Sequence, residues 1–190
     1  MIVDRICVGL GCALSVGLAG CSSSSSSPPA EAYVTASVSG GGCDLDLSQF
    51  AIGSQSSLAV NGQGANVSCS VKANGGGFDV SLSASQGIWG FSVTPQGHVA
   101  ADVDGGPAPG TLPADINDRD PAVAVTLYDN TSCVLSYESP GHGSVGPGKI
   151  WGTLTCTDLV SSQSVQVAGG GTQPMVCSGI INFEFENCAQ

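Results

Sequence analysis

Apolar and polar residues alternate along most of the chain beyond residue 40, and glycine, proline, asparagine and serine interrupt the alternation. Apolar residues at helical spacing do not persist there for three turns. The alternating segments are Cys43–Leu47, Val67–Val71, Phe78–Leu82, Val123–Leu127, Cys133–Tyr137, Ile150–Cys156 and Ile181–Phe185. Because successive side chains of a strand point to opposite faces, each segment should bury one face and expose the other to solvent. The pattern predicts an all-β fold, an antiparallel β-sandwich of roughly ten strands.

The N-terminal segment has a different pattern, in which Arg5 precedes an apolar run over Ile6–Leu18. The run is shorter than the about 20 residues that cross a bilayer, so it predicts a signal peptide. It ends in Leu18-Ala19-Gly20-Cys21, which resembles the lipobox of bacterial lipoproteins. The resemblance implies that residues 1–20 are cleaved and that the thiol of Cys21 carries a lipid. The alternative is an ordinary secretory signal with a chance cysteine.

The residues after Cys21 are six serines, Ser22–Ser27, followed by Pro28 and Pro29. Such a segment cannot bury apolar surface, so residues 21–31 are predicted to be a flexible stalk and residues 32–190 one β-domain. Ser22 directly after the lipidated cysteine resembles the pattern that sends lipoproteins to the outer membrane. We therefore expect an exported protein, anchored to a membrane by its lipid, at the outer membrane or the cell surface.

The charge of the chain limits its partners. Four basic and fifteen acidic residues give a net charge of −11 at pH 7. Such a surface repels phosphate backbones, which argues against nucleic-acid binding. A cation, a basic protein or a glycan remains compatible with it.

Six of the nine cysteines lie beyond the leader and the lipidation site. They are Cys43, Cys69, Cys133, Cys156, Cys177 and Cys188. An even number in an exported chain predicts three disulfides, and six cysteines allow 15 pairings. Those in the alternating segments share the phase of their apolar neighbours, so they should face the core as staples. Cys156 and Cys177 flank a Gly-rich loop and could meet as hairpin neighbours.

Two further stretches resemble the small mycobacterial lipoprotein antigens. They are Val60–Leu82, which contains Val67-Ser68-Cys69 and Phe78-Asp79-Val80-Ser81-Leu82, and the late Lys149–Thr155 with Phe183–Cys188. The resemblance implies a bond between Cys69 and Cys188, which would leave Cys43 with Cys133. It also implies a surface-exposed protein with no settled enzymatic activity.

Motifs for catalysis are weak. Gly143–Lys149 has the spacing of a phosphate-binding loop, but Ile150 replaces the hydroxyl residue and a strand follows, so we expect a hairpin loop. His98 and His142 are the only imidazoles, and either would need a serine and a carboxylate brought by the fold. A paired-carboxylate glycosidase usually needs aromatic platforms, and aromatic residues make up 5% of the chain.

Ligand-binding features are more numerous. Two acidic loops contain carboxylates that could supply oxygens to calcium, although such turns are usually only solvated. The candidate calcium ligands are Asp102, Asp104, Asp115, Asp118 and Asp120. Trp151 has the opposite phase to Ile150 and could face outward, where an indole can stack on a sugar. Trp89 stands between Ile88 and Gly90 and suggests a turn edge.

The sequence thus predicts a non-catalytic envelope lipoprotein whose β-domain binds or scaffolds. The alternative is a ligand-binding module for carbohydrate, calcium or a small apolar molecule. An exported hydrolase is the least supported class. A concave groove lined by Trp151 or by the acidic loops would favour binding.

Overall fold

The computed structural model describes residues 27–40, 50–101, 110–118, 125–128, 133–137 and 144–190. Within these ranges the chain forms strands, turns and coil, with no helix. The strands are β1 (Glu31–Ser39), β2 (Phe50–Ile52), β3 (Ala59–Val60), β4 (Ala65–Asn74), β5 (Gly77–Gln86), β6 (Trp89–Ala100), β7 (Thr111–Leu112), β8 (Asp115–Asp118), β9 (Val125–Tyr128), β10 (Cys133–Ser136), β11 (Val145–Gly146), β12 (Lys149–Val167) and β13 (Gly171–Glu186).

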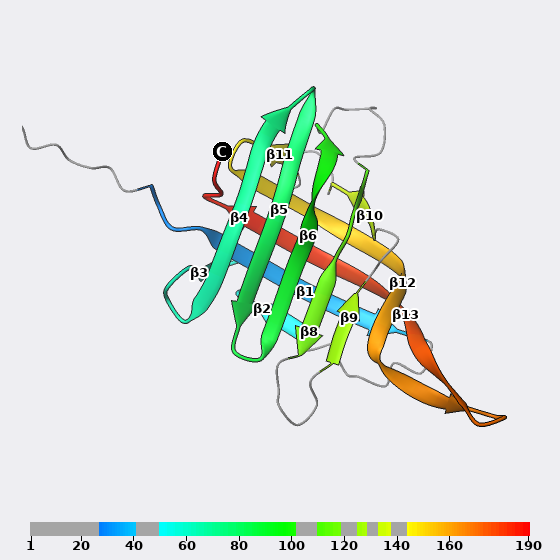
Figure 1. The fold of residues 1–190 in the computed structure, drawn as a ribbon. Coiled ribbons are helices and arrows are strands. Elements are labelled where there is room, and N and C mark those ends of the chain that lie inside the picture. Colours follow the sequence, from blue (N-terminus) through cyan, green and yellow to red (C-terminus); the bar gives the residue numbers. More distant parts are fainter. Residues whose placement is uncertain (1–26, 41–49, 102–109, 119–124, 129–132, 138–143) are drawn as a thin grey trace, which may run out of the picture.

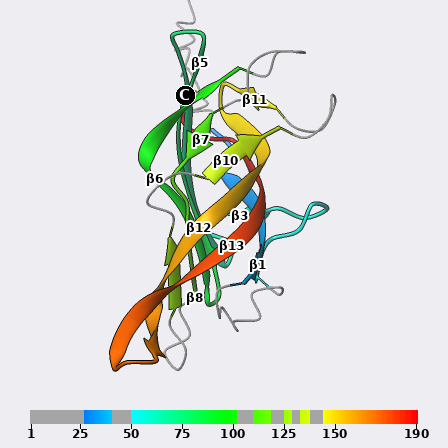
Figure 2. The ribbon, with the colours of Figure 1, turned by 90° about the vertical axis from the view of Figure 1, so that its right-hand side faces the viewer.

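The strands form two antiparallel sheets packed face to face, which confirms the predicted β-sandwich (Figure 1). One layer contains β4, β5, β6, β8 and β9, and the other is built on β1, β13 and β12. Figure 2 shows the two layers nearly edge-on. We call the layer of β1, β13 and β12 the terminal sheet, because it contains the first and last strands of the described chain.

The two layers are linked at both edges. The distal part of β12 pairs with β9 through Val160 and Ser161, so the hydrogen-bonded order runs continuously from one layer into the other. At the opposite edge, Ala189 lies beside β4: its N–H donates to the carbonyl of Cys69, and its own carbonyl accepts from Val71 N–H. Because edge strands expose unpaired backbone groups, these contacts protect part of the edge of β4.

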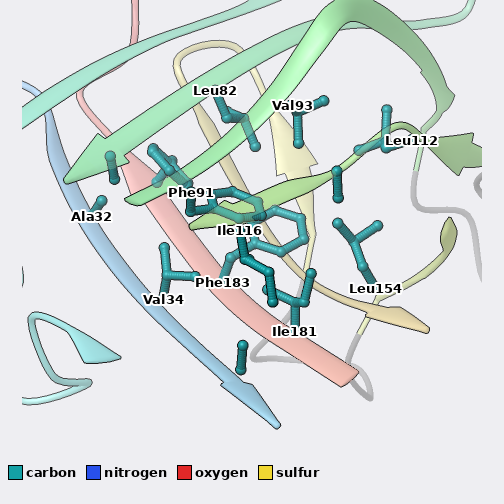
Figure 3. Packing of buried hydrophobic residues seen from close by; sticks show 14 of the residues in the cluster. Ala32, Val34, Leu82, Phe91, Val93, Leu112, Ile116, Leu154, Ile181 and Phe183 are labelled. Atoms are coloured by element: carbon teal, nitrogen blue, oxygen red, sulfur yellow. The ribbon is translucent and has the colours of Figure 1, made fainter. Parts of the chain in front are cut away.

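The core lies between the layers and consists of the apolar phase of each strand. Phe91 of β6 reaches across to Phe183 and Phe185 of β13, with both ring centroids 6.0 Å away (Figure 3). The predicted inward phases are confirmed where they are described. These buried residues are Val67, Val71, Val80, Leu82, Leu135, Ile150, Leu154, Ile181, Phe183 and Phe185. Cys43–Leu47 and Val123 lie outside the described residues.

Two disulfides form within the described residues. Cys69 bonds Cys188 over a sequence separation of 119, and Cys133 bonds Cys156 over a separation of 23. The first is the bond that the family resemblance implied. All four cysteines are buried, as is Cys177, which confirms that they share the core-facing phase.

The predicted pairs Cys156–Cys177 and Cys43–Cys133 are wrong, because Cys156 and Cys133 bond each other. Cys133 and Cys156 lie opposite each other on β10 and β12, with Cα atoms 4.3 Å apart. Cys156 lies opposite Gly179 of β13, and Leu159 lies opposite Cys177 after a bulge in β12, so Cys156 and Cys177 are not cross-strand neighbours. Cys177 is also disulfide-bonded, to a cysteine outside the described residues.

The segment with phosphate-loop spacing is a hairpin, as predicted. Val145 pairs with Ile150 and Gly146 with Lys149, which leaves Pro147 and Gly148 as the turn. Gly148 has φ of 77°, the left-handed value that the third position of a type II turn requires and that glycine adopts readily. The segment therefore joins two antiparallel strands and does not open a helix.

Candidate functional site

The outer face of the terminal sheet places three chemically distinct side chains in one row. Tyr33 of β1 and Trp151 of β12 are the cross-strand neighbours of Glu184 of β13, one on each side. Adjacent strands lie about 4.8 Å apart, so the two aromatic residues flank the carboxylate at a span of about 10 Å. The arrangement follows from alternation: their neighbours Val34, Ile150 and Phe183 face the core, which turns these three outward.

A groove of about 410 Å³ opens at this row. It is lined by Tyr33, Gln55, Trp151, Gly152, Asn182, Phe183 and Glu184. Gln55 comes from the segment between β2 and β3, so the groove combines the sheet face with a loop. Its volume lies in the range of small-ligand sites, about 300–1,000 Å³.

A second hollow of about 220 Å³ includes the next outward positions of the same two strands. Lys149 lies two residues before Trp151 on β12, and Glu186 lies two residues after Glu184 on β13. Residues at this spacing share a strand face, so the two hollows follow each other along β12 and β13.

The groove offers both hydrogen-bond donors and acceptors. Asn182 Oδ1 accepts a hydrogen bond of 2.8 Å from Thr153 Oγ1, which orients its amide and leaves Nδ2 to donate elsewhere. The indole Nε1–H of Trp151 is enclosed and has no acceptor among the described residues. An unsatisfied buried donor costs about 1–3 kcal/mol, so this donor favours any arrangement that brings it an acceptor.

The carboxylate of Glu184 is held in an unfavourable environment. Partial burial raises its pKa above the usual value, and the neighbouring charge of Glu186 raises it further. Within the described residues, no hydrogen bond or ion pair to this carboxylate offsets that cost. Groups with such perturbed pKa values occur preferentially at functional sites.

The two tryptophans occupy different environments. Trp151 lies on the outward phase of β12, as predicted. Trp89 is the first residue of β6, directly after a turn, and its ring packs 5.2 Å from that of Phe50. Only Trp151 therefore contributes to the groove.

The predicted acidic loop beginning at Asp115 is partly a strand. Asp115 and Asp118 belong to β8, and residues three apart on a strand point to opposite faces. The two carboxylates therefore do not converge on one ion as a loop would allow. Partial burial raises the pKa of Asp115, and a 3.4 Å hydrogen bond from Ser92 Oγ opposes the shift.

The other candidate calcium ligands, Asp102, Asp104 and Asp120, lie outside the described residues. Within the described part of the chain, no group of three or more His, Cys, Asp or Glu residues is arranged to hold a metal ion.

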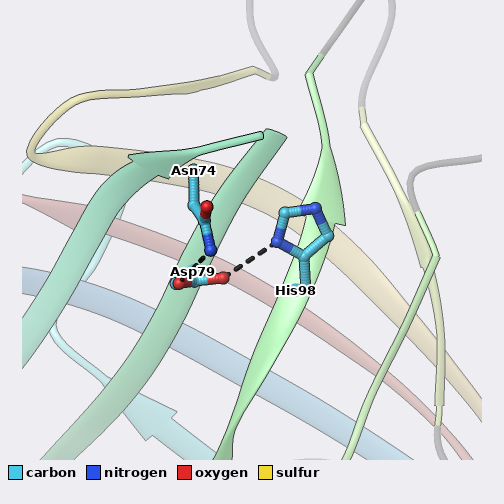
Figure 4. Close-up of polar contacts among 3 residues, drawn as sticks. All are labelled: Asn74, Asp79 and His98. Carbon is cyan, nitrogen blue, oxygen red and sulfur yellow. Dashed lines mark hydrogen bonds and ion pairs between the residues drawn. The ribbon is translucent and has the colours of Figure 1, made fainter. Parts of the chain in front are cut away.

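His98 of β6 contacts a carboxylate of the adjacent strand β5, in the layer that faces the terminal sheet (Figure 4). Its Nδ1 donates to Asp79 Oδ1 at 2.9 Å, and Asn74 Nδ2 donates to Asp79 Oδ2 at 2.8 Å. These two hydrogen bonds lower the pKa of Asp79, and the hydrogen bond from His98 contributes most to this shift. In the described structure His98 has no hydrogen bond to a serine, so a nucleophilic triad is not assembled there. His142 lies outside the described residues.

Sequence reasoning found Trp151 but missed the other residues of the groove. Tyr33, Asn182 and Glu184 occupy the outward phases of strands β1 and β13, so their outward orientation could have been deduced from alternation. Their juxtaposition could not, because it depends on the register of three strands that are far apart in the chain. The loop position of Gln55 carries no pattern that would have indicated it.

Comparisons with protein-family models, curated proteins and solved structures find no match to this chain. The described residues include no helix of the length and hydropathy that membrane crossing requires. Cys21 and the leader lie outside the described residues.

Proposed function

We propose that this chain is a lipid-anchored, non-catalytic envelope protein that binds a glycan in the groove between Tyr33 and Trp151. The observation that supports the proposal most is the row of two aromatic residues with a carboxylate between them, beside the amides of Asn182 and Gln55. Sugar rings present apolar C–H faces and a rim of hydroxyl groups. Aromatic faces pack against the former, and amides and carboxylates pair with the latter.

The anchor places this groove near a membrane. Tyr33 follows Cys21 by 12 residues, and an extended chain spans at most about 3.3–3.6 Å per residue. If Cys21 carries the lipid, Tyr33 lies within about 40 Å of the bilayer surface. The proposed ligand is therefore a glycan of the envelope layer closest to that membrane.

The anchor is tested by the intact mass of the protein recovered from host membranes, before and after reduction and alkylation. We expect a chain that begins at Cys21, carries acyl groups, and has six cysteines that react only after reduction. A chain without lipid, or with thiols that react before reduction, would contradict the proposal.

The groove is tested by binding of the purified full-length protein to an array of neutral, amine-bearing and acidic oligosaccharides. We expect binding that is reduced at least tenfold by Trp151→Ala, because the change removes the aromatic surface on which a sugar ring would pack. Val134→Thr is the matched control: Val134 is exposed on the same sheet, on β10, but does not line the groove. Equal binding by wild type and Trp151→Ala, or no glycan bound at all, would reject the groove as the site.

A further inference from the structure

We infer that the groove selects an oligosaccharide that carries a protonated amine, and that Glu184 is the carboxylate that recognises the amine. This inference rests on the proposed glycan-binding function and specifies its ligand class. The carboxylate lies between two aromatic residues, in the row Tyr33–Glu184–Trp151, and all three line the same groove.

Among the described residues, Glu184 has no hydrogen-bond or ionic partner. Its carboxylate is partly buried and receives no hydrogen bond from the described residues. An ammonium group supplies what is missing, because it donates up to three hydrogen bonds and offsets the negative charge. A neutral hydroxyl would satisfy the hydrogen bond but leave the charge uncompensated.

Aromatic side chains flank the carboxylate of Glu184, one on each neighbouring strand. The faces of tryptophan and tyrosine rings attract cations that lie within about 6 Å of the ring centroid. A cation placed over Glu184 is thus attracted by the carboxylate and by the side chains of Tyr33 and Trp151. A bound anion would be repelled by the carboxylate of Glu184.

The remaining charges on this face are also mainly acidic. Glu31 and Glu186 are cross-strand neighbours one row beyond Glu184, and Lys149 is the basic residue on the same face of β12. Two further carboxylates against one ammonium leave the face net negative. The amine would therefore approach a favourable potential, and acidic glycans would be repelled.

The two consecutive hollows indicate a ligand longer than one ring. The groove at Trp151 and Glu184 is followed along the same two strands by the hollow at Lys149 and Glu186. Neighbouring outward rows on these strands are about 6.7 Å apart. A chain of linked sugars can occupy both hollows, with its amine at Glu184.

The test compares two probes that differ only at the nitrogen: the β-1,4-linked trimer of glucosamine and the same trimer with every amine acetylated. Binding of each to the full-length protein is measured by calorimetry at pH 6.5. We expect wild type to bind the amine form at least tenfold more tightly. Glu184→Gln, which keeps the shape of the side chain, should reduce this preference to less than about twofold.

Asp158→Asn is the matched control, because Asp158 is exposed on β12 and its replacement removes the same charge from the molecule. It should keep the preference of wild type. Thermal unfolding of both variants shows whether each is folded. Equal affinity of wild type for the two trimers, or a preference that Glu184→Gln does not change, would overturn the inference.

The outcomes separate this inference from the proposed function. If both trimers bind equally and Trp151→Ala weakens both, the groove binds glycans without selecting an amine. If neither trimer binds, the amine inference is rejected, and the glycan array then decides whether the proposed function fails as well.

Discussion

Glu184 is a residue whose environment in the fold opposes its ionised form. A glutamate on a sheet surface ordinarily remains well solvated, but here packing on the terminal sheet partly buries it and raises its pKa. The ionised form is therefore less favourable in the folded protein than in the unfolded chain. Because most proteins tolerate lower stability where a site requires it, this cost is consistent with a binding role.

The pH dependence of stability follows from the direction of this shift. The pKa of Glu184 is higher in the folded protein than in the unfolded chain, so the native state binds the proton more readily. The free-energy cost of holding the ionised carboxylate in the fold therefore appears as pH rises through the range between the unfolded and folded pKa values. Glu184→Gln should therefore raise the melting temperature at pH 7 and have a smaller effect below pH 4. Melting curves of wild type and variant from pH 3 to pH 8 test this. A variant that is less stable than wild type at pH 7 would contradict the assigned environment.

At the scale of elements, alternation predicted the strands and their buried faces better than it predicted their ends and partners. The phase of β4, β5, β10, β12 and β13 was correct because each has a clear period of two. Strands β1, β2 and β6 were not predicted. The two-residue strands β3, β7 and β11 were also missed, since two residues show no period. Asp115–Asp118 was expected as a loop because three of its four residues are polar, but β6 and β9 supply partners on both sides.

Register also explains why the disulfides could be predicted only in part. All the described cysteines face the core, which phase alone indicated. Which of them meet depends on strand register: β12 is aligned with Cys156 opposite Cys133 of β10 and opposite Gly179 of β13, and local pattern does not indicate these alignments. The Cys69–Cys188 bond was indicated by the family resemblance and not by local pattern.

Gly152 of β12 should not tolerate a side chain. A Cβ at this position would lie 2.8 Å from Leu135 Cδ1 and 3.0 Å from the carbonyl oxygen of Ser136. Gly152→Ala should therefore destabilise the protein by about 1–3 kcal/mol in chemical denaturation. Gly146→Ala is the control, because its nearest contact would be 3.7 Å, and it should change the stability by less than about 0.5 kcal/mol. Equal effects of the two changes would argue against this packing.

The third disulfide is predicted by elimination. Cys177 is bonded, and the other four described cysteines are paired with each other. Cys43 is the remaining cysteine beyond the lipidation site. Peptide mapping of the unreduced protein should therefore recover Cys43 linked to Cys177. Recovery of Cys177 linked to any other cysteine, or of Cys43 as a free thiol, would contradict the prediction.

At the scale of the whole molecule, the groove at Trp151 and Glu184 lies on a disulfide-linked β-sandwich. The proposed lipid anchor at Cys21 would hold this groove close to a membrane. The sequence was sufficient for the fold class, because alternation and cysteine phase act locally along each strand. It was not sufficient for the site, because Tyr33, Trp151 and Glu184 come from the two ends of the sandwich domain and meet only through strand pairing. Gln55 joins them from a loop, whose position depends on the completed fold.

The most direct test of the account is the fluorescence of Trp151 during ligand titration. The chain has two tryptophans, so Trp89→Phe leaves Trp151 as the only indole reporter while an aromatic ring still packs against Phe50. We expect a saturable change in Trp151 emission when the glucosamine trimer or its acetylated form is added, with a midpoint equal to the calorimetric Kd. Binding that leaves the emission of Trp151 unchanged would place the ligand elsewhere and contradict the account.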